Sequence, residues 1–498
     1  MSVLVYWNKL SPEQQSLIGK LLLISPKQSF HDIKKNKWKK WPNKNETNDD
    51  DEKSTTVMMH DYDPKTDIIK LPYKFSQILL GENLNLYKPL YNNIFNFNFS
   101  LLDNQIDLYN NAWTYLLKHN TLNFCPFTGS GKTAMAIKMT ADLSKFQTVG
   151  VNLVIMTMTS LLPQWRDSIK QFTDAIPYIV DSPKFQPPIN CNFLITTPGM
   201  IIHIPEIWRY QIGVLIIDEA HTMCSTSRVN SLLYTQPKYV IACTATFERD
   251  NEMHKMIETI TGPDRLELLS KNPFKVYKIN TGCNMPIPQN KFGENDWNQL
   301  INMLANDEYR NNLILEFVKM YHTKHKMLVF TLRKEHAKFL NNKTIEMGIK
   351  SDFMVGNKKN YNDSNVLYGS IQKLGTGFDE KMKCLDFNGI RIDYLFLTFS
   401  IKSLPTLKQV SGRVTSRAEY PNIGYLVDDN HISEGHFKKG AAWFSSANGT
   451  IHEINTLKHI ENIKNKELSN TRKDKLSIEY RQAIEMKKEL ELHKLKNY

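Results

Sequence analysis

The sequence predicts an α/β protein that contains two tandem parallel-sheet domains. Short apolar runs alternate with amphipathic stretches in two blocks, over residues 99–265 and 305–450. Such a strand–helix–strand succession is typical of a parallel sheet covered by helices on both faces. In the first block a glycine-rich loop opens a helix, and an acidic pair ends an apolar run. These two features are the usual halves of a phosphate site.

Composition narrows the class of protein. At 498 residues the chain can form two or three domains, each with its own core. Its 41% hydrophobic and 23% charged residues are typical of a soluble globular protein. The formal net charge of +12 favours a polyanionic partner, usually nucleic acid, although surplus lysine can serve solubility alone.

Six cysteines are scattered along the chain without a Cys-x-x-Cys pair. This spacing argues against a zinc site and against a disulfide framework, so we expect a reducing compartment. The first residues show no signal-peptide pattern, and no apolar run approaches the roughly 18 residues that span a membrane. We therefore expect a soluble intracellular protein with no membrane partner.

Residues 1–98 form an expected N-terminal accessory region. Ser11-Pro12-Glu13 predicts the start of a helix. A basic run with interleaved tryptophans, residues 34–41, precedes an acidic run at residues 48–52. The basic run can stack on bases or grip phosphates, or the two runs can form a solvated, mobile loop whose charges balance.

Residues 99–265 are expected to form the first parallel-sheet domain. Three apolar runs read as strands buried on both faces, and two stretches read as helices. The strands lie at Leu153–Met156, Asn192–Ile195 and Val214–Ile217, and the helices at Asp103–His119 and Ala134–Ser144.

The second block has the same organisation. Gly282, Pro286 and Pro288 mark an expected connector over residues 266–304, and the second domain is expected over residues 305–450. Its helices are expected at Glu308–His322 and Glu335–Met347, and its strands at Met327–Phe330, Asn365–Tyr368 and Tyr394–Leu397. Residues 451–498 are helix-prone and densely charged, which predicts a charged helical tail.

The glycine-rich loop reads Phe-Thr-Gly-Ser-Gly-Lys-Thr from Phe127 to Thr133. Its glycines let backbone N–H groups point at phosphate oxygens, and the helix that follows adds positive potential. Lys132 would reach the β- and γ-phosphates, and the Thr133 hydroxyl would hold Mg²⁺. The alternative is a tight turn before a helix, since Pro126 stands where the pattern has Gly or Ala. The predicted ATP-binding residues of this loop are Thr128, Gly129, Ser130, Gly131, Lys132 and Thr133.

The acidic pair Asp218 and Glu219 follows the apolar run at residues 214–217. Asp218 would bind Mg²⁺ in its outer sphere, and Glu219 would orient and deprotonate the attacking water. Two carboxylates at the end of a buried strand are costly without a cation or a donor, which disfavours a purely structural role. His221 either couples the nucleotide state to the segment at residues 244–246 or caps the turn after the strand.

These motifs together resemble those of superfamily 2 helicases and translocases, over roughly residues 100–430. Residues 157–165 resemble motif Ia, 195–199 motif Ib, 244–250 motif III, 375–379 motif V and 409–417 motif VI. The resemblance implies two RecA-like domains and an ATP-hydrolysing enzyme that uses ATP and Mg²⁺.

The resemblance also assigns roles to single residues. Gln105 is implied to read adenine, and Asp379 is implied in the ATP site. Arg413 and Arg417 are implied to act as catalytic arginines that meet the γ-phosphate when the two domains close. Coupling roles are implied for His221, Thr244, Thr246 and Gln409. The hydroxyl groups implied to contact a nucleic-acid backbone, each of which can instead bond to the protein backbone at a strand end, belong to Thr157, Thr196, Thr197, Thr331, Ser370 and Thr376.

Within the superfamily, Asp-Glu-Ala-His at residues 218–221 combined with Thr-Ala-Thr-x-x-Arg-Asp at 244–250 resembles the duplex-DNA translocases. Residues 71–75, which lie before the core, resemble the transcript-release helicases of poxviruses and other large cytoplasmic DNA viruses. We therefore expect an ATP-driven DNA helicase or translocase, acting on DNA or an RNA–DNA hybrid in viral transcription, replication or repair. Such a protein would work in the host cytoplasm, in a viral factory, or in the virion.

One alternative remains open from the sequence. An ATP-switched, nucleic-acid-binding transcription factor subunit would hydrolyse ATP without separating strands. Either the N-terminal region or the charged tail would then dock a transcription or replication protein. We found no nuclease carboxylate cluster in the sequence outside the helicase motifs, which disfavours a restriction-type enzyme.

Overall fold

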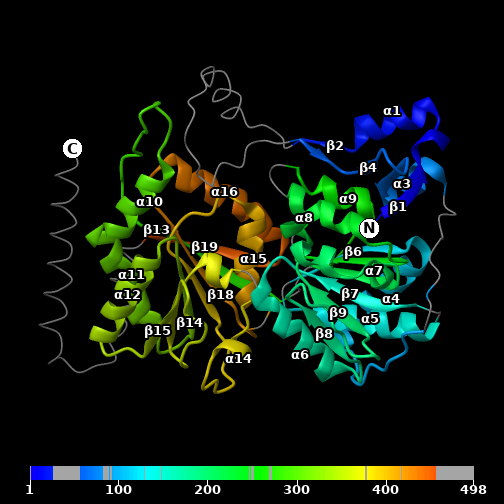
Figure 1. Ribbon diagram of the computed structural model, residues 1–498. Helices are drawn as coiled ribbons and strands as arrows, with labels where there is room; N and C mark the ends of the chain where they lie inside the picture. Colours follow the sequence, from blue (N-terminus) through cyan, green and yellow to red (C-terminus); the bar gives the residue numbers. More distant parts are fainter. Residues whose placement is uncertain are drawn as a thin grey trace, which may run out of the picture. The chain divides into compact units, whose positions relative to one another are not determined.

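The computed structural model describes residues 2–25, 56–81, 89, 92–127, 129–146, 149–245, 247, 252–268, 272–375, 378–416 and 418–455 (Figure 1). The chain divides into two compact units, residues 1–269 and 270–498. The basic and acidic runs at residues 34–41 and 48–52 lie outside the described residues.

A seven-stranded parallel sheet forms the centre of unit 1, with the strand order β12-β6-β11-β10-β7-β9-β8. All seven residues of the central strand β10 are buried, as expected for a strand covered on both faces. The strands are β6 (Thr121–Pro126), β7 (Val151–Ile155), β8 (Pro177–Val180), β9 (Phe193–Thr196), β10 (Ile212–Asp218), β11 (Tyr239–Cys243) and β12 (Arg265–Leu268).

Helices cover both faces of this sheet (Figure 1). Alternate residues of β10 enter different hydrophobic clusters: Leu215 and Ile217 on one face, Val214 and Ile216 on the other. The face with Val214 and Ile216 packs against α4 (Asp103–His119), α5 (Lys132–Phe146) and α6 (Leu162–Phe172). The face with Leu215 and Ile217 packs against α8 (Thr226–Ser231) and α9 (Lys255–Thr261). The short helix α7 (Glu206–Arg209) precedes β10.

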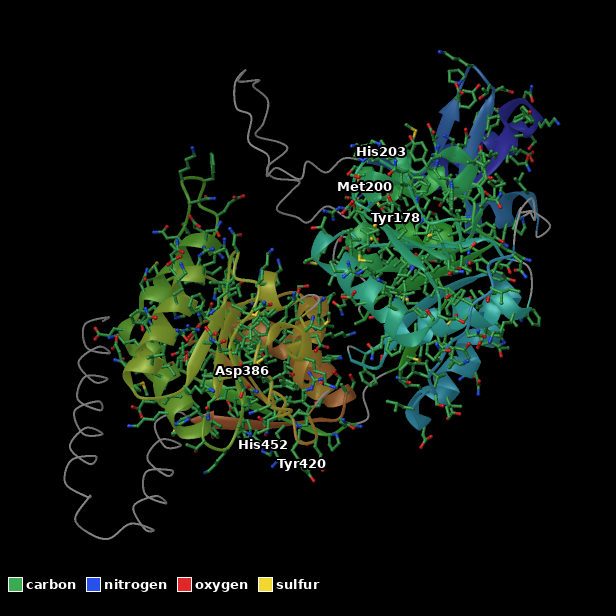
Figure 2. All side chains as sticks on the ribbon, turned by 60° about the horizontal axis from the view of Figure 1, so that its bottom comes forward. Tyr178, Met200, His203, Asp386, Tyr420 and His452 are labelled. Atoms are coloured by element: carbon green, nitrogen blue, oxygen red, sulfur yellow. The ribbon has the colours of Figure 1, made fainter. Side chains whose placement is uncertain are left out.

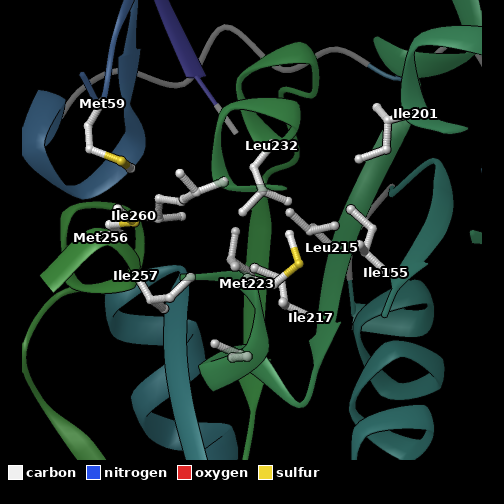
Figure 3. Close-up of a cluster of buried hydrophobic side chains, with 14 of the residues drawn as sticks. Met59, Ile155, Ile201, Leu215, Ile217, Met223, Leu232, Met256, Ile257 and Ile260 are labelled. Atoms are coloured by element: carbon white, nitrogen blue, oxygen red, sulfur yellow. The ribbon is translucent and has the colours of Figure 1, made fainter. Parts of the chain in front are cut away.

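The N-terminal region shares its core with this sheet. Met59 belongs to the same buried cluster as Ile257 and Ile260 of α9 (Figure 3), and the backbone N–H of Ser2 donates to the carbonyl of Thr235 at 2.9 Å. Helix α1 begins after Ser11, as the sequence predicts, and Ser11 forms a capping box with Gln14. The elements of this region are β1 (Ser2–Tyr6), α1 (Pro12–Leu21), β2 (Leu23–Ile24), β3 (Val57–Met58), β4 (Asp61–Asp63), β5 (Ile68–Pro72) and α3 (Tyr73–Leu80).

A second seven-stranded parallel sheet, with the order β15-β16-β14-β17-β18-β13-β19, forms the centre of unit 2. Its strands are β13 (Phe274–Asn280), β14 (Met327–Thr331), β15 (Ser351–Met354), β16 (Val366–Ser370), β17 (Tyr394–Leu397), β18 (Asn422–Val427) and β19 (Gly449–Asn455). Its helices are α10 (Trp297–Asn306), α11 (Glu308–Tyr321), α12 (Lys334–Glu346), α13 (Ile371–Leu374), α14 (Glu380–Lys383), α15 (Leu404–Thr415) and α16 (His431–Ser446). Helices α11 and α12 cover one face, and α15 and α16 cover the other (Figure 1).

Two expectations about this half of the chain are corrected. Residues 266–304, expected as a connector, contain most of β12 in the first sheet, all of β13 in the second sheet, and the start of α10. The expected helical tail begins instead as strand β19, which pairs with β13 along its whole length. On β19, His452 (labelled in Figure 2) stacks on Tyr277, with ring centroids 5.6 Å apart. The residues of β19 read Gly-Thr-Ile-His-Glu-Ile-Asn and have low helix propensity, so the charged, helix-prone composition of the longer segment hid a strand at its start. Residues 456–498 lie outside the described residues.

The two units are tandem RecA-like domains, each with a parallel sheet between two layers of helices. This confirms the fold class that the alternating pattern predicts. In the part of the chain that the structure describes, no helix has the length and apolar character of a membrane span.

Candidate nucleotide-binding site

The glycine-rich loop joins β6 to α5 in unit 1. Gly129 and Gly131 have φ angles of 88° and 87°, a region that L side chains rarely adopt. A Cβ atom on Gly131 would also lie 2.2 Å from Nε2 of Gln105 and displace that amide. Backbone conformation and close approach therefore both require glycine at position 131. Thr128 lies outside the described residues.

Gln105 holds this loop from the first turn of α4. Its Nε2 donates to the carbonyl of Ser130 at 2.7 Å, and its Oε1 accepts from the backbone N–H of Leu102 at 3.0 Å. Each end of the amide therefore makes one hydrogen bond inside unit 1, and the predicted contact with adenine stays a prediction. By contrast, the Ser130 hydroxyl is buried without a hydrogen-bond partner among the described residues. A buried, unpaired hydroxyl in a loop of this shape fits an anionic ligand.

Lys132 begins α5 and lies beside the end of β10. Its Nζ is 3.7 Å from Oδ1 of Asp218 and 3.7 Å from Oε1 of Glu219. Burial lowers the pKa of Lys132, but the two carboxylates outweigh it and hold that pKa above its usual value. The ammonium group therefore stays charged where the loop, the helix start and the acidic pair meet.

Glu219 has a left-handed backbone, with φ 49° and ψ 51°. For a residue other than glycine, this conformation costs on the order of 1 kcal/mol or more, and such strain clusters at functional sites. The left-handed conformation of Glu219 ends β10 and keeps the Glu219 carboxylate beside Lys132. The other carboxylate oxygen, Oε2, lies 3.5 Å from Nδ1 of His221.

Asp218 is held by two donors at the carboxyl end of β10. Its Oδ1 accepts from the backbone N–H of Glu219 at 3.0 Å, and its Oδ2 accepts from the indole Nε1 of Trp165 at 2.8 Å. Burial raises the pKa of Asp218, whereas Lys132 and the indole hydrogen bond oppose that rise. Sequence reasoning did not single out Trp165. Trp165 lies inside motif Ia, at an otherwise apolar position of α6, and it carries an indole N–H donor. That donor was the feature of the sequence that could have identified it.

His221 connects the ends of two neighbouring strands. Its Nδ1 lies 2.9 Å from Oγ1 of Thr244, the residue that follows β11. This contact joins the two segments that the coupling interpretation connects, and the coupling role of His221 stays a prediction. Thr246 lies outside the described residues. Nearby, the hydroxyl of Thr157 donates to Thr222 Oγ1 at 2.8 Å, and Thr197 is half-buried after β9.

The donor set fits a magnesium–nucleotide complex. The described residues contain no group of three or more His, Cys, Asp and Glu side chains that could hold a metal by themselves. Mg²⁺ commonly binds through one or two protein oxygens together with substrate phosphates and water. Asp218 and the half-buried Thr133, in the first turn of α5, are the oxygen donors suited to this role.

In unit 2 the motif VI helix α15 is tied to motif V. The guanidinium of Arg413 donates to the carbonyls of Gly375 at 2.5 Å and Phe378 at 2.9 Å, and the side chain is 5% exposed. Arg413, which is predicted to contact the γ-phosphate, thus forms its hydrogen bonds within unit 2. Thr376 and Arg417 lie outside the described residues.

Two further motif residues are also placed within unit 2. Asp379 caps α14, since its carboxylate accepts from the backbone N–H of Lys381 at 2.9 Å, and it lies 3.7 Å from Nη1 of Arg391. Gln409 is half-buried on α15. The predicted ATP contact of Asp379 and the coupling role of Gln409 stay predictions.

Two of the expected nucleic-acid contacts are corrected. Thr196 is buried, and its hydroxyl donates to the carbonyl of Val180 at 2.8 Å. Thr331 is likewise buried, and its hydroxyl donates to the carbonyl of Arg333 at 3.0 Å. Both hydroxyls satisfy backbone groups at strand ends, the alternative that the sequence left open. Ser370 is also buried, although it lines a cavity of unit 2.

Comparison with known proteins finds a family whose model matches the part of the chain that contains this site. The family described as "Type III restriction enzyme, res subunit" matches residues 98–249, which include the loop and the acidic pair. Protein 161L of Invertebrate iridescent virus 6, named as a helicase, is 27% identical over 439 residues, covering 80% of this chain and 95% of that protein. Protein 055L of Frog virus 3, also named as a helicase, is 26% identical over 364 residues, covering 71% of this chain and 79% of that protein.

A shorter match links the chain to a cellular protein. The DNA 3′-5′ translocase XPB2 of Sulfurisphaera tokodaii is 28% identical over 137 residues, which are 27% of this chain and 29% of that protein. The matched family, the viral relatives and the ordered motifs agree, and they imply an enzyme that hydrolyses a nucleotide. These comparisons support the resemblance that the motifs indicate: the chain is similar to superfamily 2 helicases of large DNA viruses.

Proposed function

We propose that this protein is an ATP-dependent DNA helicase or translocase whose two RecA-like domains close on ATP to hydrolyse it. The observation that carries this proposal is the position of Lys132. Its ammonium lies 3.7 Å from both Asp218 and Glu219, next to a positive-φ glycine loop with the unpaired Ser130 hydroxyl. A structural turn has no need of this combination.

The chemistry follows from the residues around the loop. The backbone N–H groups of residues 129–132 and the Lys132 ammonium would bind the phosphates, and Thr133 and Asp218 would hold Mg²⁺. When bound, the metal neutralises charge on the β- and γ-phosphates. Glu219 would accept a proton from the attacking water, because its strained backbone keeps the carboxylate at the end of β10.

The remaining positive charge would come from motif VI. An arginine that meets the γ-phosphate is typically worth 10³–10⁵ in rate. Arg413 must release the carbonyls of Gly375 and Phe378 to take this part, whereas Arg417 follows at the end of the same motif. We propose that Arg417 supplies the charge in catalysis and that Arg413 positions motif V.

Closure and opening of the domains would then move the protein along a strand. Hydrolysis removes the group that favours closure, so each cycle shifts the grip of one domain relative to the other. The net charge of +12 supports a nucleic-acid track, and the relative named as a DNA 3′-5′ translocase supports DNA and that polarity. Viral transcription, including transcript release, replication and repair are the processes proposed for it.

The glycine loop is tested by Lys132→Ala, with Lys138→Ala as a matched control. Lys138 lies on the same helix, where it pairs with Asp142 at 2.8 Å, away from the acidic pair. We expect Lys132→Ala to abolish ATP hydrolysis while DNA binding persists, and Lys138→Ala to hydrolyse ATP like the wild type. Turnover that survives Lys132→Ala would show that the loop is not the phosphate site.

A strand-displacement assay separates the motor from the alternative of an ATP-switched transcription factor subunit. Such a subunit would hydrolyse ATP but release no strand from a partial duplex. A helicase releases the strand, and a pure translocase displaces a bound protein block instead. The wild-type protein needs only one of these two activities to exclude the switch.

A further inference from the structure

A loop of unit 2 exposes apolar side chains that the proposed reaction does not use. It covers residues 380–392, which start with α14 and end just before β17, and we call it the α14 loop. Met382, Leu385 and Ile390 of this loop are 49%, 69% and 62% exposed. Figure 1 shows α14 and the chain that follows it at the lower edge of unit 2. Single exposed aliphatic side chains are common on protein surfaces, whereas a group of them marks an interaction site.

The two ends of the α14 loop are joined to each other. The buried carboxylate of Glu380 accepts from the backbone N–H of Ile392 at 2.9 Å and lies 3.2 Å from Nη1 of Arg391. Cys384 is also buried, and its backbone N–H donates to the carbonyl of Glu380 at 2.8 Å. The first and last residues of the loop therefore lie together.

One ion pair anchors the middle of the α14 loop. Lys326 pairs with Asp363, and Nζ of Lys326 also donates to the carbonyl of Ile390 at 3.0 Å. The backbone N–H of Asp363 donates to the carboxylate of Asp386. Because the same ion pair holds Asp386 and Ile390, it brings Leu385 and Ile390 to one part of the surface.

The α14 loop lies at the amino ends of the strands in the second sheet. Its anchor Lys326 directly precedes β14, and Asp363 lies shortly before β16. By contrast, Thr331 and Ser370 end these two strands at the opposite edge of the sheet. A partner on the α14 loop therefore leaves the carboxyl ends of β14 and β16 free, the end at which ligands bind in open α/β sheets.

Basic side chains without an ion pair surround the loop. Among the residues that the structure describes, four lysines on the loop or beside it form no ion pair: Lys350, Lys359, Lys381 and Lys383. Lys359 is beside it because the backbone N–H of Tyr361 donates to the carbonyl of Lys383 at 3.0 Å. Asp386 is the exposed acidic residue of the loop, and the backbone N–H of Asp363 and the charge of Lys350 lower the pKa of its carboxyl. The lysines outnumber this acid, which favours a partner with acidic groups.

The exposed side chains distinguish between classes of partner. Met382, Leu385 and Ile390 are aliphatic, so they cannot stack on nucleobases as aromatic side chains do. A second copy of this chain that used the same surface would bring the lysines of both loops together, because a two-fold interface places a surface against itself. An apolar centre with complementary charges around it is typical of an interface with a different protein.

We propose that the α14 loop is a docking site for another protein, which contributes a segment with apolar side chains flanked by aspartate and glutamate. Leu385 and Ile390 would be buried at the centre of the interface with Met382 beside them, and the lysines would face the acidic groups at its rim. This docking site goes beyond the proposed function, because it needs neither nucleotide nor nucleic acid. The loop is anchored before a partner arrives, so docking orders little of the chain.

Peptide selection on the full chain, without nucleotide or nucleic acid, tests the site. The probe is a displayed library of random peptides of about 16 residues, which span about 24 Å as a helix. We expect selection to enrich peptides that combine Asp or Glu with large apolar residues. Fluorescence anisotropy would then measure how these peptides bind to the wild type, Leu385→Ser, Ile390→Ser and Ile207→Ser. Ile207, on α7 of unit 1, is 62% exposed like Ile390, so it is a matched control.

Leu385→Ser and Ile390→Ser should each weaken binding of the enriched peptides by about 10-fold or more, because each removes a contact at the centre of the interface. Ile207→Ser should bind them like the wild type. Lys381→Gln combined with Lys383→Gln should weaken binding by about 3-fold or more and reduce its dependence on salt. The variants should keep the wild-type thermal transition, since the replaced apolar side chains are mostly exposed.

Any of three results would overturn the docking site. Selection could enrich no common sequence, or it could enrich basic peptides. The enriched peptides could also bind Leu385→Ser and Ile390→Ser as tightly as the wild type. Binding of DNA that both serine variants weaken, with no enriched peptide, would show that the loop contacts nucleic acid instead. None of these measurements uses ATP hydrolysis, so failure of the docking site is distinguishable from failure of the proposed function.

Discussion

At the scale of single residues, the site depends on charges that neutralise one another in a confined space. Lys132 offsets two carboxylates, and Asp218 is further stabilised by the indole N–H of Trp165. Burial alone would favour the neutral form of Asp218, which cannot bind a cation well. The tryptophan therefore acts as a positioning residue, because it keeps one oxygen of Asp218 oriented and charged.

Trp165→Phe tests this role, with Trp113→Phe as control. The change removes the indole donor and raises the pKa of Asp218, so the acid limb of the ATPase pH profile should move to higher pH. The Mg²⁺ concentration for half-maximal activity should also rise by about 10-fold or more, since an unpaired buried acceptor costs about 1–3 kcal/mol. Trp113 is a half-buried residue of α4, and its change should move neither quantity. Coincident pH profiles and Mg²⁺ requirements for Trp165→Phe and wild type would contradict this role.

At the scale of elements, helix α15 is tied to Gly375 and Phe378 of motif V. Arg413 joins them through two backbone carbonyls and is almost fully buried. A change in the position of α15 is therefore transmitted to motif V. Motif VI thus contains an arginine with a structural role as well as the candidate for catalysis.

Arg413→Ala and Arg417→Ala should consequently fail in different ways. Arg413→Ala leaves two buried carbonyls without their donor, so we expect a lower free energy of unfolding, by about 1–3 kcal/mol, together with slower hydrolysis. Arg417→Ala should keep the wild-type thermal transition and lose about 10³-fold or more in single-turnover rate. Thermal unfolding and single-turnover kinetics check both. Wild-type stability of Arg413→Ala, or wild-type turnover of Arg417→Ala, would contradict the division of roles.

At the scale of the whole molecule, the proposed reaction cycle divides its groups between two RecA-like domains. Unit 1 holds the loop and the acidic pair, and unit 2 holds motifs V and VI. Among the residues that the structure describes, neither unit has every group that the proposed reaction needs. Hydrolysis would therefore depend on both domains.

Much of this organisation could be predicted from the sequence. The apolar runs predict both sheets because strands buried on two faces read as continuous hydrophobic segments, as β10 does. The glycine loop and the acidic pair were recognisable because their chemistry depends on residues close together in the sequence. Lys132 and Asp218 lie far apart in the sequence, so their positions along the chain do not reveal that their side chains lie close together. The resemblance of the motifs implied it.

Features set by distant packing could not be predicted. Ser2 and Met59 join the core of the first sheet through contacts with residues far along the chain. Strand β19 pairs with β13 along its whole length, whereas the composition of residues 451–498 taken together predicted a helix. The burial of Thr196 and the internal bonds of Arg413 likewise depend on neighbours that no local pattern reveals.

The most direct test of the central claim is the steady-state ATPase rate of the wild-type protein at low salt, across single-stranded DNA, duplex DNA, RNA and an RNA–DNA hybrid. A motor of this kind should hydrolyse ATP at least about 10-fold faster with its preferred strand than alone, and salt should abolish that stimulation. An ATPase rate that stays the same with every one of these nucleic acids would contradict the account.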